Sequence, residues 1–106
     1  MTPFQERIRG IIPAMLTALD EKFAVDPQAM RRSARRLLDN GCQGVVVVGT
    51  SGEFAGIDDD QHPIAIRAVV EELSGQAPVI VGCGQPNVRR THEQAQQAAD
   101  LGADGL

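Results

Sequence analysis

Short apolar runs recur along the chain at intervals of about 30 residues, the length of one strand–helix unit. They occupy residues 11–16, 45–48 and 78–81, and a fourth run only begins at Leu106. Runs this short and rich in Val and Ile predict strands buried on both faces, as in a parallel sheet.

Helical patterns separate these runs. In the first, Asp26 is the predicted N-cap, Pro27 fills the first helical position, and Gly41 marks the end. One face of this helix is apolar, with Met30, Ala34, Leu37 and Leu38. Its arginines, which could suggest a phosphate site, are better explained as a solvated outer face. They are Arg31, Arg32, Arg35 and Arg36.

Two further helices are predicted, from about Asp60 to Leu73 and from about Val88 to Leu101. The apolar stripe of the second helix consists of Ile66, Val69, Val70 and Leu73. The third helix has a face of small residues that would let it lie close to a sheet: Thr91, Ala95, Ala98 and Ala99. Gly75 and Gly102 follow the two helices as stops.

This alternation predicts an α/β protein, a partial (β/α)₈ TIM barrel. The chain would hold about the first three β/α units and the start of strand 4. Residues 1–106 are then the N-terminal part of a single TIM-barrel domain, since eight such units need about 250 residues. A domain that ended at Leu106 would leave an open sheet edge, so we expect a longer chain.

The main alternative is a phosphate- or nucleotide-binding α/β module with a doubly wound sheet. That fold places G-x-G-x-x-G directly after its first strand. Here the only G-x-G after a predicted strand is formed by Gly82 and Gly84, and Asn87 stands where the third glycine belongs. The motif therefore gives this alternative little support.

Composition narrows the range of partners. The net charge is −4 and the aromatic residues are three Phe, so neither a basic surface nor stacking platforms favour nucleic acid binding. The apolar runs are too short to span a membrane, and the N-terminus has no signal-peptide pattern. Cys42 and Cys83 lack metal-ligand spacing, so we expect reduced thiols in a cytoplasmic protein and no metal site.

The strongest candidate for chemistry is the loop at residues 49–54, Gly-Thr-Ser-Gly-Glu-Phe, directly after the second predicted strand. Two glycines permit a tight turn with exposed backbone N–H groups, and two hydroxyls lie between them. Successive N–H donors with hydroxyls form a cradle for a carboxylate or phosphate oxygen. A simple structural Gly-Ser turn remains the alternative explanation.

The same loop resembles the Gly-Thr-Thr-Gly-Glu signature of the dihydrodipicolinate synthase / N-acetylneuraminate lyase family. Residues 10–17 are similar to the family's first strand, and residues 78–84 are similar to its third. Residues 102–105, Gly-Ala-Asp-Gly, are like the approach to its fourth strand. The resemblance covers nearly all of the chain beyond about residue 9, in register.

This resemblance implies a carbon–carbon lyase of the class I aldolase type. In the family a lysine forms a Schiff base with pyruvate, and the resulting enamine adds to an aldehyde. By position, Thr50 matches a catalytic threonine of a proton relay, and Ser51 matches the residue that holds the pyruvate carboxylate. Gly49 and Gly52 would shape this substrate-binding turn, and Thr17 would face the same pocket. No cofactor is expected, and the full-length protein is expected to be a homotetramer.

Some departures leave the reaction open. Ala18 stands where the family usually has Pro, and Phe54 where the synthases have a small polar residue. N-acetylneuraminate lyase, keto-deoxy sugar acid aldolase or dehydratase, and hydratase-aldolase activities are therefore alternatives. Lys22 is the only lysine, it follows two acidic residues, and the chain has no tyrosine. We expect Lys22 at the surface and the 106-residue chain alone to be inactive.

Overall fold

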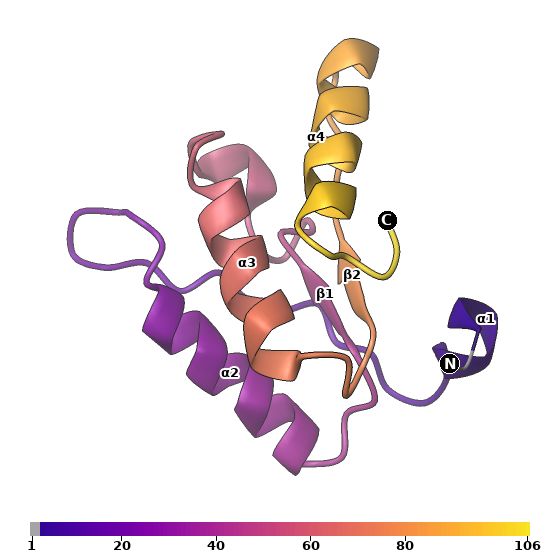
Figure 1. The fold of residues 1–106 in the computed structure, drawn as a ribbon. Helices are drawn as coiled ribbons and strands as arrows, with labels where there is room; N and C mark the ends of the chain where they lie inside the picture. The colour runs from indigo at the N-terminus through magenta and orange to yellow at the C-terminus, as the bar shows by residue number, and fades with distance from the viewer. Residues whose placement is uncertain (1–2) are drawn as a thin grey trace.

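The computed structural model describes residues 3–106. Its helices are α1 (Phe4–Arg7), α2 (Pro27–Asp39), α3 (His62–Leu73) and α4 (Val88–Asp100), with a 3₁₀ turn η1 (Phe54–Gly56). The strands are β1 (Val45–Val47) and β2 (Val79–Val81). Figure 1 shows α2, α3 and α4 together on one side of the strands, with α1 apart from them.

The two strands run parallel, with Val46 paired to Ile80 at the middle of the register. An extended segment continues the sheet on each side: Ala14 bridges Val46, and Gly105 bridges Ile80, both in parallel orientation. The order across the sheet is therefore the order along the chain. This sequential parallel arrangement confirms a partial (β/α)₈ barrel, because a doubly wound sheet reverses its strand order.

Residues 11–16 differ from the expected strand buried on both faces. Two hydrogen bonds join the segment to Val46 of β1, from Met15 N to Val46 O at 2.8 Å and from Val46 N to Pro13 O at 2.9 Å, and they form a single bridge. Ile11 and Leu16 are 70% and 73% exposed. The segment is an edge with a partner on one side only, and Pro13 offers no N–H to a second neighbour.

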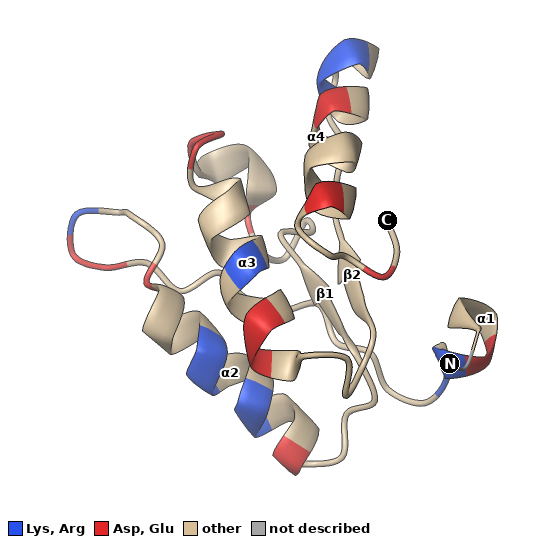
Figure 2. Ribbon diagram, viewed as in Figure 1, with Lys and Arg blue, Asp and Glu red and all other residues tan. Residues whose placement is uncertain are grey.

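Helix α2 begins and ends where the sequence predicts. The Asp26 side chain accepts a hydrogen bond from Ala29 N at 3.0 Å, and Gly41 has a φ of 97°. The arginines of α2 are only partly a solvated face, since two of them form ion pairs with α3: Arg31 with Glu71, and Arg35 with Glu72. Figure 2 shows basic bands on α2 and acidic bands on the neighbouring α3.

Helix α3 starts at His62, two residues later than expected, and buries Ile66, Val69 and Leu73 as predicted. The predicted small-residue face of α4 is only partly correct. Ala98 is buried, but Ala99 is exposed. Among the described residues, α4 packs against α3, and its buried stripe is narrow.

Candidate functional site

The candidate site is the turn of residues 49–53, which directly follows β1. Glu53 N donates to Thr50 O at 3.0 Å, and Phe54 N donates to Gly49 O at 3.3 Å, so backbone bonds close the turn. The turn therefore lies at the carboxyl end of the parallel strands, where barrel enzymes carry their active sites.

The backbone conformation of this turn differs from the one expected from its glycines. The residues with positive φ are Val48, at 48°, and Glu53, at 59°, while neither Gly49 nor Gly52 has one. Left-handed conformations are costly for side-chain-bearing residues and persist only where surrounding structure enforces them. The neighbours of the turn, and not glycine flexibility, therefore determine its shape.

The first neighbour is the end of the extended segment before α2. Thr17 Oγ1 donates a hydrogen bond to Gly52 O at 2.6 Å. A Cβ atom on Gly52 would lie 3.0 Å from Met15 O and 3.2 Å from Thr17 Oγ1. A side chain on Gly52 would therefore be tightly placed, and the hydrogen bond brings Thr17 into contact with the turn.

The second neighbour is the residue that follows β2. A Cβ atom on Gly82 would lie 2.6 Å from Val48 O and 2.8 Å from Gly49 Cα. The backbone of the next strand therefore passes directly against the start of the turn. Three strand ends, at Thr17, Gly49 and Gly82, meet at one edge of the sheet.

The two hydroxyl residues, Thr50 and Ser51, are both exposed, as is Glu53. Gly52 between them and the strands is buried. The turn thus exposes two hydroxyl-bearing residues on a backbone that hydrogen bonds hold in place. Such a set of donors suits an anionic oxygen, because each N–H or O–H can point at the same acceptor.

Two other side chains complete the surroundings of the turn. His62, to which the sequence assigned no role, is buried, and its Nε2 lies 2.9 Å from Phe54 O. Cys83 lies beyond Gly82, with its Sγ 3.4 Å from Val81 O, and burial raises the pKa of its thiol. A histidine at a helix start, eight residues after Phe54, was the only sequence signal for the first of these contacts.

Lys22 is not part of this turn. It is exposed, as expected, in a turn where Asp20 Oδ1 accepts hydrogen bonds from Lys22 N and Ala24 N. His92 is likewise exposed. Within residues 3–106, no group of three or more His, Cys, Asp or Glu side chains could hold a metal ion, and no helix is long and apolar enough to cross a bilayer.

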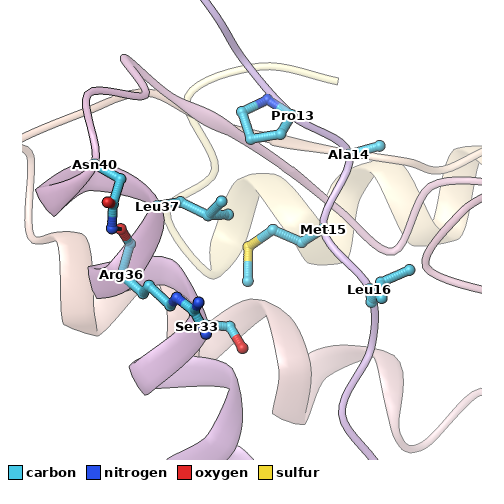
Figure 3. A pocket seen from close by; sticks show the side chains of 8 residues that line it. All are labelled: Pro13, Ala14, Met15, Leu16, Ser33, Arg36, Leu37 and Asn40. Atoms are coloured by element: carbon cyan, nitrogen blue, oxygen red, sulfur yellow. Dashed lines mark hydrogen bonds between the residues drawn. The ribbon is translucent and has the colours of Figure 1, made fainter.

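A groove of about 400 Å³ lies between the extended segment and α2. Figure 3 shows Met15 and Leu37 directed toward one another across it, with Arg36 at its edge. Its lining comes from residues 13–16 and from the last part of α2. The groove therefore belongs to the open edge of the sheet and not to the turn.

Comparison with known proteins gives consistent results. A 4-hydroxy-tetrahydrodipicolinate synthase of Natronomonas pharaonis is 41% identical over 97 residues, which are 92% of this chain and 33% of that protein. A dihydrodipicolinate synthase of Acinetobacter baumannii, solved with pyruvate, superposes with a TM-score of 0.88 at 29% identity, covering 93% of this chain and 34% of that one. A sialic acid aldolase of Ruminococcus gnavus gives 0.85 at 26% identity, covering 92% and 32%.

The chain therefore spans about a third of the length of the relatives that it matches. The sequence pattern of the Dihydrodipicolinate synthetase family matches residues 7–106. That match contains the sequential parallel strands, the turn at residues 49–53 and the two neighbours that hold it. This chain belongs to the dihydrodipicolinate synthetase family.

Proposed function

We propose that the turn of residues 49–53 binds the carboxylate of pyruvate or a related 2-keto acid, as part of a carbon–carbon lyase. The observation that carries the proposal is the exposed Thr50–Ser51 pair on a turn fixed at both flanks by Thr17 and Gly82. A fixed set of donors does not have to be ordered when the anion binds, so more of the interaction contributes to affinity. The pyruvate complex of the Acinetobacter baumannii relative supports this choice of ligand.

The proposed reaction is that of a class I aldolase. A lysine amine attacks the keto carbon of pyruvate and water leaves, giving an iminium ion. Loss of a methyl proton gives an enamine, whose carbon attacks an aldehyde and forms the new bond; cleavage follows the reverse path. The iminium is the electron sink, so the reaction needs no added cofactor. Thr50 is proposed to relay protons, and Ser51 to hold the carboxylate.

The lysine of this reaction is proposed to lie outside residues 1–106. Lys22 is the only lysine in the sequence, and it is exposed beside Asp20. A Schiff-base lysine must lose its proton at neutral pH, which burial promotes and an exposed acidic turn does not. Cleavage of a sugar acid is the second candidate reaction, because the chain is also similar to a sialic acid aldolase.

Pyruvate titration of the ¹⁵N-labelled chain, followed by NMR, tests the binding site. We expect the amide signals of Ser51, Gly52 and Glu53 to shift, and we expect Ser51→Ala to weaken binding severalfold. Ser33→Ala is the matched control, because Ser33 is an exposed serine on α2. Shifts that avoid the turn, or that are identical in Ser51→Ala, would refute the proposed site.

Borohydride reduction in the presence of pyruvate tests the placement of the lysine. We expect no pyruvyl adduct on Lys22, as read by mass spectrometry of the intact and digested chain. A stable adduct there would show that the exposed lysine is competent and would contradict the proposal.

A further inference from the structure

His62 is the one polar or charged residue among the buried side chains of residues 3–106, with 2% of its surface exposed. A buried imidazole is costly unless its polar atoms find partners. Its Nε2 atom lies 2.9 Å from the carbonyl oxygen of Phe54. Because a carbonyl oxygen can only accept, Nε2 must carry the hydrogen and donate it.

The backbone of Phe54 connects His62 to the turn, because its N–H and its carbonyl each form a hydrogen bond. The Phe54 N–H donates to Gly49 O at 3.3 Å, and the Phe54 carbonyl accepts from His62. His62 is also the first residue of α3, whose Ala65 and Ile66 are buried in the core. Phe54 is thus held between the turn and a helix that is fixed by packing.

The position of this bond matters because of the backbone at Glu53. Glu53 precedes Phe54 and adopts a left-handed conformation, with φ at 59°. A non-glycine residue in this region costs about 1 kcal/mol or more, and it needs contacts on both sides to stay there. Thr17 supplies a contact at Gly52, before Glu53, and His62 supplies one at Phe54, after it.

We propose that His62 is a positioning residue that holds the turn of residues 49–53 in its anion-binding shape. Thr17 secures the turn from the extended segment and His62 secures it from α3. The inference rests on the proposed function, since the shape matters for a keto acid carboxylate. A residue that served only to fill the core would need the volume of the ring but not its N–H.

Two variants separate these roles. His62→Leu replaces the imidazole with an apolar side chain of similar size and removes the Nε2–H donor, whereas His62→Gln supplies an amide N–H at a similar distance from the backbone. We expect exchange of the hydrogen-bonded amides of Glu53 and Phe54, which close the turn, to accelerate about tenfold in His62→Leu, and pyruvate binding to weaken by about the same factor, as for one lost hydrogen bond. His62→Gln restores most of both, and the amide of Ala98 in α4 is the internal reference.

Equal acceleration at Phe54 and Ala98 would mean general destabilisation and would overturn the proposal, as would a failure of His62→Gln to restore the turn. If pyruvate does not bind the wild-type turn but amide exchange in the turn still accelerates in His62→Leu, the proposed carboxylate site is wrong while the positioning role stands. The imidazole tautomer gives a test in the unmodified chain. We expect ¹⁵N NMR to show the hydrogen on Nε2, and a bare Nε2 would overturn the assignment.

Discussion

At the scale of single residues, the site depends on where a side chain is absent. The sequence predicts that Gly49 and Gly52 shape a tight turn, yet the positive φ values belong to Val48 and Glu53. Gly82 is needed because neighbouring backbone atoms occupy the space of its Cβ, and a Cβ on Gly52 would be tightly placed against Met15 O. Sequence reasoning could identify the glycines, but only the packing of strand ends reveals why they are required.

Gly82→Ala is expected to destabilise the chain by about 1–3 kcal/mol, as overpacking against an inflexible neighbour does. Its Cβ would meet Val48 O at 2.6 Å, which is backbone and cannot move aside without disturbing the turn. Gly84→Ala is the matched control, since nothing lies within 4 Å of its Cβ position. Urea unfolding of both variants checks this, and equal losses would contradict the close-approach explanation.

Thr17→Val should lower the free energy of unfolding by about 1 kcal/mol, the net value of one hydrogen bond. The replacement keeps the shape but removes the hydroxyl that donates to the Gly52 carbonyl oxygen. Thr50→Val tests the same substitution at an exposed position and should change stability much less. Chemical denaturation measures both, and a neutral Thr17→Val would show that the turn does not depend on this bond.

At the scale of elements, local signals predicted helices better than strands. The capping aspartate of α2 and the glycine after the helix were both correct, because capping depends on neighbours within a few residues. The segment at residues 11–16 was predicted as a doubly buried strand but has a partner on one side only. The burial of a strand depends on which distant segments pack against it, and no local pattern encodes those contacts.

The N-cap of α2 provides a test at this scale. Asp26→Ala should cost about 1 kcal/mol, because the N–H of Ala29 loses its acceptor. Asp26→Ser restores an oxygen at the same position and should recover most of the loss. Thermal and urea unfolding report the difference, and similar stabilities for the alanine and serine variants would refute the capping role.

At the scale of the whole molecule, helix α1 and the last residues of the chain come into contact beside the start of β2. Arg7 Nη1 lies 3.1 Å from Asp104 Oδ1, and Asp104 Oδ2 accepts from Val79 N at 2.9 Å. A Cβ atom on Gly105 would lie 2.5 Å from the nearest carbon of the Phe4 ring, so the ring is close to the Gly105 backbone.

Removing the Asp104 side chain, which joins Arg7 to Val79, should lower the free energy of unfolding of the whole chain. Asp104→Ala is expected to cost about 1–2 kcal/mol, mainly because Val79 N loses its acceptor, with a smaller share from the part-exposed ion pair. Asp104→Asn keeps an oxygen for Val79 and should lose less. Unfolding in low and high salt separates the two contributions, and a salt-independent, equal loss in both variants would contradict this division.

The sequence by itself determined the order of strands and helices, the caps of α2, and the turn that carries the candidate chemistry, because these depend on periodicity and neighbouring residues. The tertiary structure alone decided the ion pairs between α2 and α3, the exposure of residues 11–16 and the buried role of His62. It also decided why Gly82 must lack a side chain and why Gly52 has little room for one. These features depend on which distant segments come into contact, and contacts of that kind leave no local pattern in a single sequence.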